Sequence, residues 1–304
     1  PCELPNQHVI IENISKNTFN VLYNDDILNV SPIEIEYIPR SEIELFAFDN
    51  PYFKDYFFEW DKRVNNFSKE KARYEIHQTS HENKANLKAG FDLLLQSCPD
   101  YCQLIKDTNK RIVLFDNLKI RNFAVRNMHG IAFIGATKEF TAIYYLEEII
   151  HQCGHNLFNA ATANLSDFFL IDPETPLGAY SKNPHEYRSI YSTLHGLFTI
   201  AARIDCFHKT LELDLNEPAR HELLGRLADL KRRFRTGLEF VIADEVYTSK
   251  GKELYQWLEE YCVAQFQKIE PLVKYFDYSN QSGPDFNYQE FAQINPIIKM
   301  PEYI

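Results

Sequence analysis

Residues 8–50 alternate between short runs of β-branched and aromatic residues and breaks of Asn, Asp, Pro and Ser. Runs of this kind, bounded by turn-forming residues, are typical of strands and hairpins. The run at 33–38 alternates apolar and acidic positions, which indicates a strand with one face in solvent. We therefore predict four strands, at 8–14, 19–23, 33–38 and 43–48.

Helical periodicity follows over residues 67–95. Ala85, Ala89 and Leu93 recur at i, i+4 and i+8, which places them on one face of a helix, although Gly90 interrupts the stretch. A second group of short β-like runs comes next, at 111–115, 122–125 and 131–134.

From about residue 139 the apolar spacing is helical, and we predict helices at 139–162, 186–209, 216–242 and 250–273. A Pro- and Gly-containing loop at 172–178 separates the first two helices, and the proline-interrupted tail 276–304 is expected to be irregular. The predicted class is α+β, with a helix-dominated domain at 65–304. The β-rich region 1–64 is either a peptide-recognition module or the flank of that domain.

Composition narrows the class of protein. The 304 residues are 45% hydrophobic and 25% charged, as in soluble globular proteins, and their net charge of −11 argues against a nucleic-acid partner. The sequence has no run of 18 apolar residues that predicts a membrane span, and no glycine-rich phosphate-binding motif. The six cysteines form no CxxC pair, so we expect a reduced, cytoplasmic chain.

One motif indicates metal chemistry. His151 and His155 lie in an apolar run, and residues four apart on a helix share a face, so both imidazoles can reach one metal ion. The spacing is that of HExxH, but Gln152 replaces the glutamate that deprotonates zinc-bound water in metallopeptidases. A glutamine amide cannot accept that proton. The motif therefore predicts a metal site without the hydrolytic base; two hydrogen-bonded core histidines are the alternative.

A metal site needs a third ligand from elsewhere in the fold. His195 lies in a second apolar helical run and is our candidate, with a locally hydrogen-bonded core histidine as the alternative. Glu147 precedes His155 by eight residues, which is about 12 Å along a helix. One metal ion therefore cannot bind Glu147, His151 and His155 together. We expect Glu147 and Glu148 to orient an imidazole or to be surface carboxylates.

Two further features bear on the site. Arg188 precedes His195 by seven residues, or two helical turns, so it either binds a carboxylate chelated to the metal or is an ordinary exposed arginine. His77 and His81 repeat the HQxxH spacing, but their neighbours are charged, which indicates a solvent-exposed helix face.

The segments 148–157 and 180–196 resemble the two signatures of the 2-oxoglutarate-dependent HExxH-type peptide β-hydroxylases, enzymes that modify ribosomally made peptides. The resemblance spans about residues 129–205. It implies that His151, His155 and His195 bind Fe(II) and that Arg188 anchors 2-oxoglutarate. The chain departs from the family at Gln152, at Lys182-Asn183-Pro184, which replaces a Pro-Trp-Arg stretch, and at His185-Glu186, which partly replaces an acidic pair.

The expected function is an Fe(II)/2-oxoglutarate oxygenase that hydroxylates a side-chain carbon of a ribosomal peptide. Such an enzyme needs no base to activate water, so Gln152 is compatible with it as a hydrogen-bonding group, and Tyr187 or Tyr191 would line the pocket. The partner is a peptide, with no nucleic acid or membrane. Three imidazoles suit zinc as well as iron. The alternatives are a zinc metallopeptidase-like protein and a catalytically degenerate peptide-binding protein.

Overall fold

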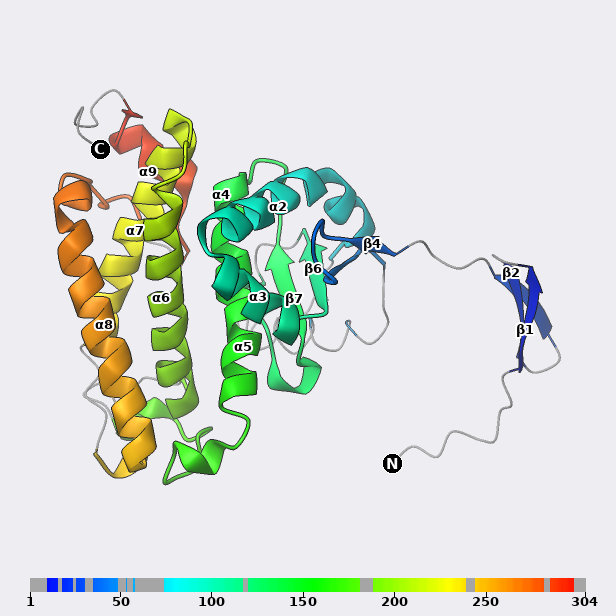
Figure 1. Ribbon diagram of the computed structural model, residues 1–304, viewed down its shortest axis with the longest axis horizontal. Coiled ribbons are helices and arrows are strands. Elements are labelled where there is room, and N and C mark those ends of the chain that lie inside the picture. The colour runs from blue at the N-terminus through cyan, green and yellow to red at the C-terminus, as the bar shows by residue number, and fades with distance from the viewer. Residues whose placement is uncertain are drawn as a thin grey trace, which may run out of the picture. The chain divides into compact units, whose positions relative to one another are not determined.

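The computed structural model describes residues 10–15, 18–23, 26–30, 35–48, 53, 57, 74–116, 120–180, 188–238, 244–281 and 285–297, with side chains outside 10–30 and 235–238. The chain divides into two compact units, residues 1–36 and 37–304 (Figure 1). The boundary predicted after residue 64 lies later than this division.

The smaller unit is a three-stranded antiparallel sheet in the order β1-β2-β3. Its strands are β1 (Ile10–Ser15), β2 (Thr18–Tyr23) and β3 (Asp26–Val30). The first two confirm predicted strands. β3 was not predicted, because Asp26 and Asn29 belong to residue types that are depleted in strands.

The sheet of the larger unit has the order β4-β5-β6-β7, and β6 pairs in parallel with both β5 and β7. Its strands are β4 (Glu36–Tyr37), β5 (Glu44–Phe46), β6 (Arg111–Phe115) and β7 (Ile131–Gly135). β6 and β7 confirm their predictions, and β4 and β5 are shorter than predicted. Of the predicted strand 122–125 only Phe123 pairs, in a single bridge to Phe133.

Both faces of this sheet are covered, as is usual for parallel strands. Along β6, Ile112 and Leu114 belong to the main core, whereas Val113 and Phe115 belong to a second, phenylalanine-rich cluster. A strand places alternate side chains on opposite faces, so β6 is apolar on both faces from Ile112 to Phe115.

The other regular elements among the described residues of the larger unit are helices, which confirms the predicted helix-dominated α+β class. They are α2 (His77–Ser97), α3 (Pro99–Thr108), α4 (Ala142–Glu148), a π-helix (Ile149–Cys153), α5 (Gly154–Ala161), α6 (Ile190–Thr210), α7 (Glu217–Leu238), α8 (Ser249–Val273) and α9 (Tyr288–Ile294). Short 3₁₀ turns occupy Arg126–Met128, Leu165–Asp167, Leu177–Ala179 and Asp244–Val246. Among the described residues, none of the helices combines the length and hydropathy needed to cross a bilayer.

Two of these helices were not predicted. α3 begins with Pro99. Proline is favoured at the first turn because the backbone N–H that it lacks would have no partner within the helix at that position. α9 interrupts the tail predicted as irregular, and the Asn287 side chain accepts a hydrogen bond from the Glu290 N–H (3.1 Å) at its start. Both helices therefore carry start signals, which their short lengths made easy to overlook.

The helices form two groups (Figure 1). α6 lies beside α7 and α8, and it also packs against α2 and the π-helix. α2 packs against both α4 and β6. The metal motif, on the π-helix and α5, thus lies between the sheet and α6.

Gly90 explains why α2 and α4 approach so closely. A Cβ atom at this position would lie 2.7 Å from the Leu146 nitrogen and 2.8 Å from the Ala142 oxygen, both backbone atoms of α4. Backbone atoms cannot move aside as a flexible side chain can. The glycine that interrupts the apolar pattern is therefore a packing requirement of the helix preceding the metal motif.

We expect Gly90→Ala to destabilise the protein by about 1–3 kcal/mol, because the clash outweighs the helix propensity of alanine. Gly196→Ala is the matched control, since a Cβ there meets no atom within 4 Å. The control should gain up to about 1 kcal/mol in the free energy of unfolding, measured in urea. A Gly90→Ala variant as stable as wild type would contradict the close approach.

Candidate metal centre

His151 lies in a π-helix that links α4 to α5, so the predicted helix at 139–162 is continuous but locally wider than an α-helix. The Ile150 carbonyl in this turn accepts a hydrogen bond from the Tyr101 hydroxyl (3.0 Å). Gly154 makes room for it, because a Cβ there would lie 2.6 Å from that hydroxyl. π-turns inside α-helices occur frequently at functional sites.

The structure brings together the three histidines predicted as ligands. The ring centroids of His151 and His155 are 4.6 Å apart. His195, on α6, stacks on His155 with centroids 3.7 Å apart and an interplanar angle of 26°. Three imidazoles from two separate segments therefore form one cluster.

Their nitrogen atoms do not converge on a single point in this conformation. Among the described residues, the one group of potential ligand atoms that all lie within 4.8 Å of one another is Cys98, Asp205 and Cys206. Stacked rings direct their faces, not their nitrogens, at each other. Coordination of one ion by His151, His155 and His195 therefore requires rotation of at least one imidazole.

The hydrogen bonding of the cluster nevertheless fits a metal better than it fits a core of satisfied histidines. Nδ1 of His155 and Nε2 of His195 are buried and have no hydrogen-bond partner. A buried polar atom without a partner costs about 1–3 kcal/mol, and a metal ion would bind such a nitrogen. Burial also lowers the pKa of all three imidazoles, to about 3 for His195, so they are neutral at pH 7 as ligands must be.

Gln152 is buried beside the first histidine, where a hydrogen-bonding role was expected. Its Nε2 donates to Oε2 of Glu148 (3.0 Å) and lies 3.1 Å from Nδ1 of His151. An amide nitrogen facing Nδ1 leaves the imidazole proton on Nε2, whereas a flipped amide would accept a hydrogen bond from Nδ1–H and free Nε2 for a metal. The orientation of the Gln152 amide therefore selects which His151 nitrogen can coordinate.

Glu148 belongs to the same cluster. Its Oε2 lies 3.8 Å from Nδ1 of His151, too far for a hydrogen bond, so it contacts this imidazole through Gln152; it is largely buried and is not a surface carboxylate. Burial and the neighbouring charge of Glu147 raise the pKa of Glu148 to about 7.

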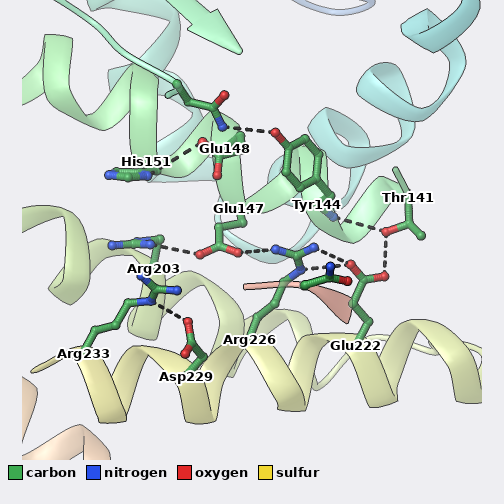
Figure 2. Close-up of polar contacts among 12 residues, drawn as sticks. Thr141, Tyr144, Glu147, Glu148, His151, Arg203, Glu222, Arg226, Asp229 and Arg233 are labelled. Carbon is green, nitrogen blue, oxygen red and sulfur yellow. Dashed lines mark hydrogen bonds and ion pairs between the residues drawn. The ribbon is translucent and has the colours of Figure 1, made fainter. Parts of the chain in front are cut away.

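Glu147 has a different role from the two predicted, since it is buried between two arginines (Figure 2). Its carboxylate accepts hydrogen bonds from Arg203 on α6 (2.9 Å) and from Arg226 on α7 (2.6 Å). Arg226 also binds Glu222 (2.7 Å), which accepts a bond from the Thr141 hydroxyl (2.7 Å) at the start of α4. The partners of Glu147 in this network, which sequence analysis did not single out, connect α4, α6 and α7.

The other predicted residues have mixed outcomes. Tyr191 packs its ring on His195 (centroids 5.3 Å apart), while its hydroxyl donates to Oδ1 of Asn159 (2.5 Å). Arg188 is exposed and precedes α6, which begins at Ile190, so its predicted position on the His195 helix is wrong.

The remaining predicted residues lie away from the cluster or outside the described part. Tyr187 and the departures at 182–186 are outside the described residues. His77 and His81 are exposed in the first turns of α2, as their charged neighbours indicated.

Comparisons with known proteins add no assignment: no protein-family model matches the sequence, and no curated protein is significantly similar to it.

Acid should destabilise the metal-free protein through His195. Its pKa is about 3 in the folded state, against an ordinary value of 6.5, so unfolding takes up a proton between these values. The free energy of unfolding therefore rises with pH over this range and has its full value above it. We expect His195→Gln to reduce the slope by up to about 1.4 kcal/mol per pH unit. Urea unfolding between about pH 4 and pH 7 measures this slope, and an unchanged slope would rule out the effect.

Removing one partner from the buried ion pairs of Glu147 should strongly destabilise the protein. Glu147→Gln leaves Arg203 and Arg226 without their shared counter-charge, and we expect a loss of about 3–5 kcal/mol in the free energy of unfolding. Glu260→Gln, on an exposed part of α8, is the matched control and should change stability by less than about 0.5 kcal/mol. Equal effects of the two substitutions in urea unfolding would contradict the role of the buried pairs.

Proposed function

We propose that the protein is a non-haem Fe(II)/2-oxoglutarate-dependent oxygenase that hydroxylates a side-chain carbon of a ribosomally made peptide, in the cytoplasm. The observation that supports it is the cluster of three neutral imidazoles with two buried, unpartnered nitrogens. The sequence resemblance supplies the cosubstrate and the peptide substrate. When bound, iron and 2-oxoglutarate would use O₂ to insert oxygen into a C–H bond, releasing succinate and CO₂.

Each protein group has a limited task in this proposal. His151, His155 and His195 would hold the metal, and they remain unprotonated because their partial burial lowers their pKa values. Gln152, with its amide oxygen turned to Nδ1 of His151, would fix the tautomer that frees Nε2, and Tyr191 supports the ring of His195 by stacking. Arg188 would bind the far carboxylate of 2-oxoglutarate from the segment before α6. None of these tasks requires a base at position 152.

The zinc metallopeptidase alternative depends on finding another base. Both oxygens of Glu147 are held by arginines, so this carboxylate is not available. Glu148 and Gln152 both face Nδ1 of His151, so a metal would bind the opposite nitrogen, Nε2, once the Gln152 amide is turned to accept a hydrogen bond from Nδ1–H. Glu148 would then lie on the Nδ1 side of the imidazole, opposite to the nitrogen that binds the metal. This geometry favours the oxygenase over the peptidase.

The test is succinate formation from 2-oxoglutarate in air by protein loaded anaerobically with Fe(II). We expect wild-type protein to form succinate and His195→Ala to lose more than about 100-fold of that activity. Mutation of a residue that only supports a metal ligand typically costs about 10- to 100-fold, and loss of a ligand should cost more. His81→Ala is the matched control, because this exposed histidine belongs to the second HQxxH sequence.

Bound iron, measured in the same samples, separates the possible results. Succinate that depends on iron and on His195 supports the proposal. Equal succinate from wild type and His195→Ala contradicts the ligand set. Wild-type protein that holds iron yet forms neither succinate nor a hydroxylated peptide overturns the oxygenase. Peptide cleavage that appears in Gln152→Glu would instead support the peptidase.

A further inference from the structure

A second cluster of ligand atoms lies apart from the histidines, where α6 meets the junction of α2 and α3. Cys98 is the residue between α2 and α3, and Asp205 and Cys206 are on α6. One ligand atom from each lies within 4.8 Å of the others. Both cysteines are free thiols and almost fully buried, at 3% and 1% exposure.

We propose that Cys98, Asp205 and Cys206 form a metal site that binds Zn²⁺. Two thiolates and a carboxylate suit a borderline-soft ion, whereas Mg²⁺ and Ca²⁺ prefer oxygen ligands alone. A tetrahedral zinc ion holds two sulfurs roughly 3.8 Å apart, so the three ligand atoms need to move by no more than about 1 Å. The fourth position is left to water, which can enter because the Asp205 side chain is 37% exposed.

The surroundings of the cluster match the charge of such a site. Zinc with two thiolates and one carboxylate carries one net negative charge, and the Lys209 ammonium lies 2.8 Å from Oδ2 of Asp205 to neutralise it. The Tyr261 hydroxyl donates to the other oxygen, Oδ1 (2.8 Å). Together these contacts fix the carboxylate beside the two sulfurs, as supporting groups commonly do for metal ligands.

Zinc binding at this cluster would release the protons of both thiols, because cysteine coordinates a metal as the thiolate.

Bound zinc would join α6 to the α2–α3 junction. Cys206 follows His195 by eleven residues, about three turns, so the two residues lie on nearly the same face of α6. A metal at the cysteine site would therefore hold the helix that carries the third histidine. The proposal does not depend on the oxygenase function, since it uses none of the histidines.

The test is titration of the reduced, metal-free full chain with Co²⁺, a spectroscopic substitute for Zn²⁺, followed by displacement with Zn²⁺. Thiolate ligation produces a sulfur-to-cobalt charge-transfer band in the near ultraviolet, which histidine ligation does not. We expect this band in wild-type protein and in His195→Ala, which separates the cysteine site from the histidine cluster. Cys262→Ser, at a buried cysteine on α8, is the matched control and should keep the band.

Cys98→Ser and Cys206→Ser should lose the band and bind Zn²⁺ more than about 100-fold more weakly. Asp205→Asn, which can still accept a hydrogen bond from the Tyr261 hydroxyl, should weaken Zn²⁺ binding about 10- to 100-fold. Zn²⁺ should raise the melting temperature of His195→Ala, in which the histidine cluster lacks one ligand, and should no longer do so when Cys206→Ser is added. Absence of the band in wild type, or its persistence in Cys206→Ser, overturns the site. A Cys98–Cys206 disulfide in air-exposed protein, with no cobalt binding after reduction, also overturns it.

Discussion

The histidine cluster depends on the ion pairs of Glu147. Two of its histidines follow Glu147 on one helical segment, and the third comes from α6, so the cluster exists only if the two segments are held in register. Glu147 precedes His151 by four residues, and its partner Arg203 follows His195 by eight. Burying these charges is costly unless their geometry is closely defined, and the same geometry specifies how α4 and α6 pack. The pairs thus contribute specificity of packing more than net stability.

The buried polar atoms of the histidine cluster have fewer hydrogen-bond partners than those of the neighbouring Glu147 ion pairs. The ion pairs leave no Glu147 oxygen unbonded, whereas buried nitrogens of His155 and His195 and the amide oxygen of Gln152 lack partners. Proteins tolerate such unpaired groups where a ligand completes them. The π-turn around His151, supported by the Tyr101 hydroxyl, is a second irregularity at the same place. The polar groups of Glu147 beside the cluster are therefore fully paired, whereas several buried polar atoms within the cluster are not.

Sequence analysis predicted the parts of this site that depend on local pattern. The sequence pattern showed two histidines in one apolar helical run and a third in another. They could be recognised because a polar imidazole is unusual among apolar side chains unless it has a binding partner. The roles of Glu147, Arg203 and Arg226 were not recognisable, because buried ion pairs between distant helices have the same residue types as solvent-exposed ones. Arg188 was misplaced because helical periodicity does not fix a helix start to within four residues. The strand β3 and the short helices α3 and α9 were missed for the related reason that short elements carry few periodic positions.

α6 brings these observations into one physical picture. Along it lie His195 of the histidine cluster, Arg203 of the Glu147 pairs and Cys206 of the thiol cluster, so three polar contacts with other segments share one rigid element. A helix transmits displacement along its axis with little loss, because each turn is hydrogen-bonded to the next. A force that shifts α6 at Cys206 is therefore resisted at Arg203 before it reaches His195. The Glu147 pairs would thus keep the histidines in place whatever the occupancy of the thiol cluster.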